Sequence, residues 1–360
     1  MQKILSGLAV LALILFTGQV FSQGCMDSGD ETVKVIGFAQ PQFNMDMDGV
    51  DMEGAAIDNN NSFMFNRARF GVTGNIPYDI TYYATAEFSP TLGGPYLCDV
   101  FVTYTGLGNW ANFTIGQYKP PFGLELSTPC HMLHTINRSR VVSELASPFR
   151  DMGLMVWGGT GDKLGKHDNV LQWHLAVMNG SGINELDDNL GKDIVARVVV
   201  SPWEWLKIGG SFKTGKQKPA SSDVEKEDER TRYGADVHFE MANFIVQGEY
   251  IYGQDNGSSL EGGGCGQDPT VVLGDFTKSG YFFQALYMTP IRLQPVVKYE
   301  YFTPDVDNAS GNMVTTWTLG FNYFLNDWSR VQVNYLINNN ESPVKYYQSQ
   351  LQVQVQAVIP

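Results

Sequence analysis

The sequence predicts an all-β protein, a transmembrane antiparallel β-barrel of 16 strands. Three observations lead to this fold class. The chain opens with an apolar export signal, and polar and apolar residues alternate through most of the remaining sequence. The connections between these alternating segments are short and long by turns along the chain, in a regular sequence. Alternation gives a strand one polar and one apolar face, and a water-filled barrel in a membrane needs both faces.

The first 22 residues have the features of a secretory signal peptide. Lys3 supplies the positive charge and residues 4–16 form an apolar run. Val20 and Ser22 are the small residues expected before a cleavage site. Lipoprotein processing at Cys25 is an alternative, although the residues before it are a poor match to those that such processing prefers. We therefore expect a signal peptide over residues 1–22 and a single barrel domain over residues 23–360.

The strands are predicted from the alternation. In DITYYATAEF (79–88), for example, Thr81, Tyr83, Thr85 and Glu87 share one face, opposite a more apolar set. Sixteen such segments of roughly 9–12 residues each are expected. They start near positions 32, 62, 79, 97, 111, 150, 169, 192, 203, 231, 243, 279, 292, 315, 328 and 347.

The connections between these segments differ in length in a regular way. The short ones are expected at 75–79, 106–112, 202–205, 241–243, 289–291 and 326–328. The long ones are expected at 44–61, 89–96, 119–149, 179–191, 214–230, 253–278, 303–314 and 338–346. Short periplasmic turns and long external loops are typical of outer-membrane barrels, whereas a soluble sandwich has no reason to collect its long loops at one end.

The tryptophans support the same interpretation. Trp110, Trp157, Trp173, Trp203, Trp205 and Trp328 lie at or near the short turns, and Trp317 lies at the other end. Indole rings favour the headgroup layer of a membrane, so the group is expected to form an interfacial girdle. The alternative is that these are ordinary core tryptophans beneath the edges of a sheet.

The last strand, QLQVQVQA (350–357), alternates glutamine with small, mostly aliphatic residues. In a wide barrel the glutamines would line a wet lumen while the aliphatic residues meet lipid. An open sheet edge is costly in hydrocarbon, so we expect this strand to pair with the first one, around residues 32–43.

Composition excludes several other classes. The net charge of −14 argues against nucleic acid as a partner, since a basic stripe is missing from the sequence. The four cysteines are far apart in sequence and form no C-x-x-C pair, so a zinc or redox motif is not expected. Cys130 and Cys265 fall in long loops and either pair or remain free thiols.

Several short stretches occur in an order that resembles the phosphate-selective porin O and P family. They are RARFGVTG (67–74), GQYKPPFGLE (116–125), NRSR (137–140), SPFRDMGLMVWG (147–158), VMNGSGIN (177–184), VARVVVSPW (195–203), LQPVVKYEYFTPD (293–305) and LGFNYFLND (319–327). The resemblance covers essentially the whole exported chain. It implies a 16-stranded outer-membrane porin that is typically a trimer, with a third loop folded into the lumen and inward basic residues that conduct anions.

The candidate pore-lining and anion-binding residues are Arg67, Arg69, Lys119, Arg138, Arg140, Arg150 and Arg197. Arg67 and Arg69 share one strand face, opposite Ala68 and Phe70, so both are expected to project into the lumen. Most of the others lie in or beside the 31-residue connection 119–149, and a connection of that length is usually functional. Lumen cations lower the barrier for an anion.

The alternative role for each basic residue is a salt bridge with an inward acid. The acids concerned are Glu87, Asp99, Glu125, Asp193, Asp236, Glu249 and Glu300. We expect this structural role for the later cations, which are Arg197, Arg232, Lys298 and Arg330.

Two features depart from the family pattern. The chain has 24 basic against 38 acidic residues, and it ends at Pro360 rather than at an aromatic residue. A non-selective or weakly cation-preferring pore is therefore one alternative, and a barrel whose loops bind a protein or glycan is another. Enzymatic and metal sites are not expected, because HMLH (131–134) and the acidic stretch 45–53 lack the spacing of known metal motifs.

The predicted function is passive diffusion of small solutes through the outer membrane, chiefly anions such as phosphate. No covalent chemistry and no cofactor are needed for this. The expected partners are small inorganic anions or other small hydrophilic solutes, the lipid of a bacterial outer membrane, and two further copies of the chain in a homotrimer.

Overall fold

The computed structural model describes residues 33–51, 54–161, 169–217, 228–261, 270–307, 309, 312–341 and 346–359. All of them belong to one compact unit, Thr32–Pro360. The predicted signal peptide at 1–22, as well as Cys25 and Cys265, lies outside these residues. Among the described residues, no helix is long and apolar enough to cross a membrane.

Sixteen strands form the wall of a closed antiparallel barrel. They are β1 (Lys34–Val50), β3 (Asn60–Ile76), β4 (Ile80–Glu87), β5 (Tyr96–Tyr104), β6 (Asn112–Tyr118), β7 (Asp151–Gly159), β8 (Leu171–Met178), β9 (Asp193–Trp203), β10 (Leu206–Gln217), β11 (Asp228–Met241), β12 (Phe244–Asn256), β15 (Phe276–Tyr287), β16 (Leu293–Thr303), β17 (Val314–Asn326), β18 (Ser329–Asn340) and β19 (Tyr346–Ile359).

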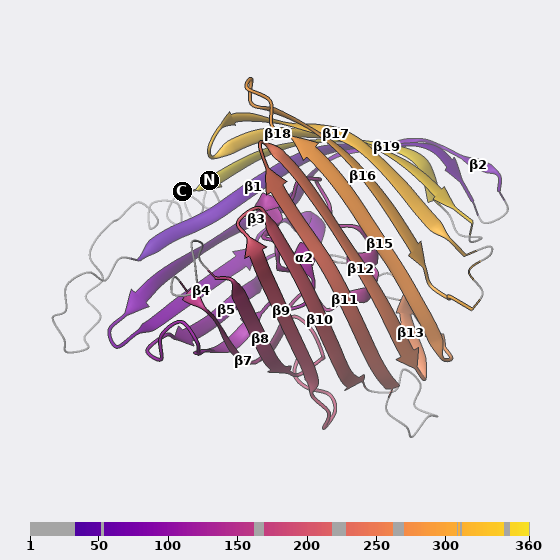
Figure 1. Ribbon diagram of the computed structural model, residues 1–360. Helices are drawn as coiled ribbons and strands as arrows, with labels where there is room; N and C mark the ends of the chain where they lie inside the picture. The colour runs from indigo at the N-terminus through magenta and orange to yellow at the C-terminus, as the bar shows by residue number, and fades with distance from the viewer. Residues whose placement is uncertain are drawn as a thin grey trace, which may run out of the picture. The chain divides into compact units, whose positions relative to one another are not determined.

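Each strand pairs with its neighbours in the chain, and β19 closes the cylinder by pairing with β1 (Figure 1). The register of this closure runs from Gly37 opposite Ile359 to Val50 opposite Tyr346. The prediction that the glutamine-rich last strand pairs with the first one is confirmed. Closure leaves no unpaired sheet edge in the wall, which is what hydrocarbon surroundings require.

The burial pattern is the reverse of that in a water-soluble protein. Gln354, Gln40 and Asn322 are completely buried on the inside of the wall. Leu319 and Val355 face outward and each keeps 45% of its surface exposed. Apolar side chains therefore cover the outer face, where lipid replaces water as the solvent, and amide side chains cover the inner face.

Every barrel strand starts within three residues of its predicted position, but the predicted lengths of roughly 9–12 residues are wrong for several strands. β1 and β3 each have 17 residues, because their pairing continues well into the segment 44–61 that was expected to be a loop. The loops expected at 214–230, 253–278 and 338–346 are likewise shortened by continued pairing. Backbone hydrogen bonds remain favourable beyond the membrane, so hydrophobic alternation alone marks the ends of these strands poorly.

Three short strands were not predicted. β2 (Ala56–Ile57) pairs with the end of β1, and β13 (Ser258–Glu261) pairs with β14 (Thr270–Leu273) in a separate two-stranded sheet. The tight connections have residues suited to hairpins. Between β11 and β12, Ala242 and Asn243 both have positive φ, at 50° and 70°, as the common two-residue hairpin turn requires.

The predicted tryptophan girdle is only partly correct. Trp110, Trp203 and Trp328 are about half exposed near the short turns. Trp157, in contrast, shares the inner face of β7 with the buried Asp151. Its indole N–H donates a hydrogen bond of 3.0 Å to Thr114 Oγ1. Trp157 therefore belongs to the interior polar network, since strand parity rather than closeness to a turn decides which face a residue occupies.

Candidate functional site: a basic cluster around Cys130

The long segment 119–149, between β6 and β7, contains α2 (Leu124–Ser127), the 3-10 helix η2 (Cys130–Met132) and α3 (Arg140–Leu145). Its apolar residues Phe122, Leu126 and Leu145 are at most 1% exposed. They belong to one apolar cluster with Ile251 and Phe282, which lie on the inner faces of β12 and β15. Each large apolar side chain buried in this way contributes about 1.5–3 kcal/mol.

A buried charge network ties the same segment to β16. Lys298, which is fully buried, donates a hydrogen bond of 2.9 Å to Glu125 Oε1 and lies 3.5 Å from Glu300 Oε1. Each carboxylate also accepts a backbone N–H of the segment, Glu125 from Ser139 at 2.6 Å and Glu300 from Arg140 at 2.7 Å. A buried charge is tolerated only when it is paired and hydrogen-bonded, and this network meets both conditions.

The start of α2 is anchored to β12 through the carboxylate of Glu249. Glu249 Oε2 accepts hydrogen bonds from the backbone N–H groups of Leu124, at 3.1 Å, and Glu125, at 2.9 Å. The preceding residue, Gly123, has φ of +65°, and a Cβ there would lie 1.9 Å from Glu249 Oε1. Only glycine allows both this backbone conformation and the close approach of the carboxylate.

Residues 131–137 of the segment contact the amide-rich strands that follow β16 around the wall. The Ile136 N–H donates a hydrogen bond of 2.8 Å to Asn334 Oδ1 on β18. The His134 carbonyl accepts one of 3.0 Å from Asn322 on β17. The segment is therefore hydrogen-bonded to inner-face residues of β12, β16, β17 and β18.

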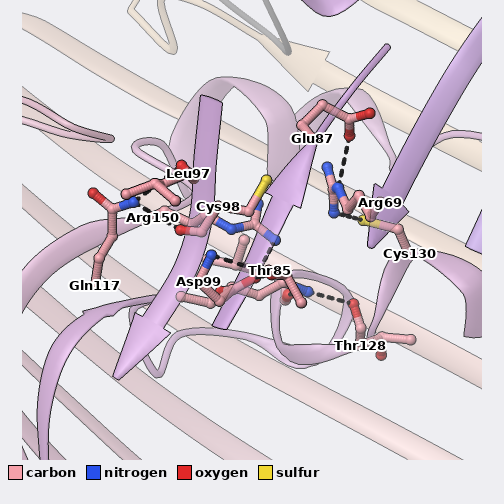
Figure 2. Close-up of polar contacts among 12 residues, drawn as sticks. Arg69, Thr85, Glu87, Leu97, Cys98, Asp99, Gln117, Thr128, Cys130 and Arg150 are labelled. Carbon is pink, nitrogen blue, oxygen red and sulfur yellow. Dashed lines mark hydrogen bonds and ion pairs between the residues drawn. The ribbon is translucent and has the colours of Figure 1, made fainter. Parts of the chain in front are cut away.

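Cys130 lies at the centre of a group of cations (Figure 2). Its Sγ is 3.1 Å from Arg69 Nη1 and 3.3 Å from Arg138 Nη1. Arg69 comes from β3 and also forms an ion pair of 2.8 Å with Glu87 on β4. Arg138 donates hydrogen bonds to the backbone carbonyls of Glu125, at 3.1 Å, and Thr128, at 2.7 Å.

Lys119 completes the cluster from the start of the segment. Its Nζ donates to the carbonyl oxygens of Leu126, at 3.0 Å, and Thr128, at 2.8 Å. Burial lowers the pKa of Lys119 to about 7, and the positive charge of Arg138 acts in the same direction.

The same environment also lowers the pKa of the Cys130 thiol. Burial alone would raise its pKa, but the charges of Arg138, Arg69, Arg67 and Lys119 outweigh burial and hold the pKa well below its ordinary value. The converging cations thus favour the thiolate form of this sulfur.

Arg150 directly follows the segment and forms an ion pair with a residue of β5. Its Nη2 lies 2.8 Å from Asp99 Oδ2 (Figure 2). The pairing of β4 with β5 shifts register between Ala84 and Ala86. A β-bulge of this kind re-aims side chains locally, and here the adjacent residues Cys98 and Asp99 are both mostly buried.

The other predicted site residues have more structural contacts. Arg67 is 3% exposed and donates hydrogen bonds to Gln40 Oε1, at 3.0 Å, and the Ile136 carbonyl, at 3.3 Å. Arg140 is exposed, and its guanidinium lies 3.6 Å from the Glu144 carboxylate one helical turn away.

Arg197 is not part of the cluster. It makes a two-pronged ion pair with Asp236, with distances of 2.5 and 2.9 Å. Arg232 similarly lies 2.5 Å from Asp255. Both residues thus have the salt-bridge role that the sequence suggested for the later cations.

Two cavities adjoin the segment. One of about 510 Å³ is lined by Thr135, Asn137, Arg138, Arg140, Ser143, Glu144, Glu300, Val314, Thr316, Thr318, Asn334, Leu336, Asn338, Asn340, Tyr346, Tyr347, Gln350 and Gln352. We call it the polar cavity. The other, of about 500 Å³, has Arg69, Lys119, Cys130 and Arg150 in its lining, and we call it the aromatic cavity because Tyr83 and several other rings share that lining. Since Arg138 lines the first cavity and contacts Cys130 in the second, the basic cluster lies where the two approach each other.

Comparison with known proteins identifies the family of the chain. Residues 39–356 match the family model described as phosphate-selective porin O and P. The chain belongs to the phosphate-selective porin O and P family. It is therefore an outer-membrane porin. No curated protein matches the sequence.

Solved outer-membrane proteins share the fold of this porin O and P chain at low sequence identity. The outer membrane channel DcaP of Acinetobacter baumannii superposes with a TM-score of 0.65 at 12% identity, over 93% of this chain and 99% of that one. An anion-selective porin from Comamonas acidovorans gives 0.62 at 13% identity, over 92% and 100%. The trimer form of OmpT from Vibrio cholerae gives 0.61 at 11% identity, over 91% and 99%.

The described residues of this porin contain no group of three His, Cys, Asp or Glu side chains arranged to hold a metal ion. The two histidines of HMLH instead contribute backbone carbonyls to the contacts with β17, β18 and β19. Burial, with the charge of Arg330, lowers the pKa of His134 to about 4, so this imidazole stays neutral at ordinary pH.

Sequence reasoning missed two parts of the site. Cys130 was expected either to pair or to remain a free thiol and was not counted among the site residues, yet this free, buried thiol lies at the centre of the cluster. The aromatic residues Tyr83, Phe101 and Tyr118 were not singled out. A signal for Tyr83 was present, because it shares a strand face with Thr81, Thr85 and Glu87 and is therefore an aromatic residue on a polar face.

Proposed function

We propose that this porin allows passive diffusion of small solutes with a preference for anions, and that the segment 119–149 narrows the path. The observation that supports this most directly is the convergence of Arg69, Lys119 and Arg138 on Cys130, between the two cavities. The proposed path runs between the two cavities, past Arg138 in the lining of one and Arg69 and Lys119 in the lining of the other.

The hydrogen-bond partners of the cluster cancel only part of its charge. Lys119 and Arg138 donate mainly to carbonyl oxygens, which carry no formal charge. The negative groups in contact with the cations are the Cys130 sulfur, whose thiolate form they favour, and the Glu87 carboxylate beside Arg69. In a narrow path with low-dielectric walls, such charges act on a passing ion more strongly than they would in water.

The overall acidity of the chain does not conflict with this preference. Acidic residues such as Asp187 and Asp188 lie in the loop between β8 and β9, and salt screens exposed charges beyond about 8 Å at physiological ionic strength. Ion selection depends on the charges beside the narrowest part of the path.

Phosphate is the anion that we propose as the natural solute. Guanidinium groups bind phosphate oxygens in a forked geometry, while a lysine ammonium acts as a compact point charge. The cluster offers both kinds of donor, from Arg69, Arg138 and Lys119.

Reversal potentials in planar bilayers across a KCl gradient test the role of the cluster. The double variant Lys119→Met/Arg138→Gln should lose most of the anion preference of the wild type. Lys192→Gln is the matched control, since Lys192 is an exposed cation that pairs with Asp187 outside the cluster. Equal reversal potentials for all three proteins would refute this role. For phosphate, millimolar additions should reduce chloride current in the wild type and have less effect in the double variant.

We also propose that export removes residues 1–22 and that residues 23–360 assemble as a homotrimer. The family and the fold support both, because porins are exported, and the V. cholerae relative was solved in a trimer form. N-terminal sequencing of the membrane protein and its mass in detergent test the two statements separately.

A further inference from the structure

The aromatic cavity has a lining that an inorganic ion does not need. Its volume is about 500 Å³, and its walls include Phe38, Tyr83, Phe101 and Tyr118 beside the cations. Tyr83 and Phe101 stack nearly in parallel, with ring centres 5.2 Å apart and 13° between the planes. Tyr118 meets Phe101 edge-on at 6.2 Å. These last three rings come from the neighbouring strands β4, β5 and β6.

The cations in the same lining are Arg69, Lys119 and Arg150. Arg69 and Arg150 each have one carboxylate partner at 2.8 Å, Glu87 and Asp99 respectively. The cavity thus combines flat apolar rings with basic side chains in one lining.

Three polar atoms of lining residues have no hydrogen-bond partner within the described part of the chain. They are the Tyr118 hydroxyl, His131 Nδ1 and Arg150 Nε, and all three atoms are buried. Buried polar atoms are normally satisfied, so these three add unsatisfied polar capacity to the residues around the cavity. Tyr118 itself is only 4% exposed.

The polar cavity gives an internal comparison. Apart from Tyr346 and Tyr347, its lining consists mainly of Asn, Gln, Thr and charged side chains. It suits a hydrated ion. A hydrated ion would lose part of its hydration shell in the aromatic cavity, and the rings there would not replace the lost contacts with water. The volume and mixed lining fit an organic ligand better.

We propose that the aromatic cavity is a binding site for aromatic carboxylates, with the ring beside Tyr83, Phe101 and Tyr118 and the carboxylate near Lys119 and Arg150. Aromatic rings attract one another in stacked and edge-on geometries beyond their burial of apolar area. A guanidinium group binds a carboxylate through parallel hydrogen bonds. The proposal rests on the proposed anion preference, since the carboxylate must first be admitted, and it adds ring-bearing carboxylates to the small anions that the porin takes.

The test measures chloride current through the full-length porin while benzoate or acetate is added. Both probes carry one carboxylate, and only benzoate carries a ring. Benzoate should halve the current at a concentration at least about tenfold lower than acetate, a ratio that corresponds to about 1.4 kcal/mol. Equal half-blocking concentrations in the wild type would overturn the proposal, whatever the variants do.

Phe101→Leu tests the location of the site, because it keeps an apolar side chain and removes the ring. This variant should bring the two half-blocking concentrations close together. Phe113→Leu is the matched control, since Phe113 is 39% exposed and lies on the outer face of β6; it should keep the wild-type ratio. A Phe113 variant that loses the ratio while the Phe101 variant keeps it would place the effect at the lipid surface and refute the assignment.

Failure of this inference differs from failure of the proposed function. A wild type that prefers cations in KCl would refute the proposed function. A wild type that prefers anions but does not distinguish benzoate from acetate would refute only the aromatic site.

Discussion

Lys298→Met should release the segment 119–149 from the wall of the barrel. Lys298 is fully buried and compensates both Glu125, which belongs to the segment, and Glu300 on β16. Methionine has a similar length and no charge, so the substitution removes the compensation and leaves little empty volume.

The expected magnitude depends on the burial of this network. Breaking a buried ion pair by removing one partner costs about 3–5 kcal/mol, because the remaining charge is left without compensation. At about 1.4 kcal/mol per tenfold change, detachment of the segment should become roughly 150-fold to 4,000-fold more frequent. The backbone N–H groups of Ser139 and Arg140 would still bind the two carboxylates in the variant. We therefore expect a change in the frequency of detachment nearer the lower end of this range.

Limited proteolysis of the folded porin measures this detachment, since cleavage within 119–149 requires local opening. The variant should be cleaved faster in that segment and should show larger current fluctuations in single-channel records. Lys298→Met/Glu125→Gln removes charge from both sides and should recover part of the protection. Cleavage and current noise equal to those of the wild type would show that Lys298 does not anchor the segment.

Three other variants test separate parts of the structure. Since the pKa of Lys119 is about 7, its charge is present below pH 7 and lost above it. Anion preference should therefore fall between pH 6 and 8 in reversal-potential measurements, and Lys119→Met should remove this pH dependence. Gly123→Ala places a Cβ 1.9 Å from a buried carboxylate oxygen at a φ of +65°, so it should lower the midpoint of unfolding in urea. The control Gly210→Ala adds a carbon with no atom within 4 Å and should leave the midpoint unchanged. Leu319→Lys puts a charge on the lipid face and should lower the free energy of unfolding in vesicles by up to about 2–4 kcal/mol. The control Thr316→Lys puts the charge at the polar cavity and should lower that free energy less.

The fold was largely predictable because alternation is a local property. A strand in a barrel has one lipid face and one wet face, so DITYYATAEF and QLQVQVQA each indicate their own orientation. The strand ends were less predictable, as β1 and β3 show, because pairing beyond the membrane depends on the partner strand. To predict that Trp157 faces inward, the alternation of faces along β7 would have had to count for more than closeness to a turn.

The site was predictable only in part. Alternation placed Arg67 and Arg69 on the inner face, where both are buried. The meeting of Arg69 with Cys130 and Arg138 depends on the path of the segment 119–149, which in turn depends on contacts with β12, β16 and β18. These contacts join residues more than a hundred positions apart, as with Glu249 and Glu125, and alternation along one strand carries no information about them.

The sign of the reversal potential of the wild-type porin across a KCl gradient tests the central claim most directly. The cations around Cys130 predict that chloride permeates more readily than potassium, with the preference weakening as salt concentration rises. A preference for potassium at low salt would contradict the claim, because it would mean that the acidic residues of the chain, rather than this cluster, select the ions that pass.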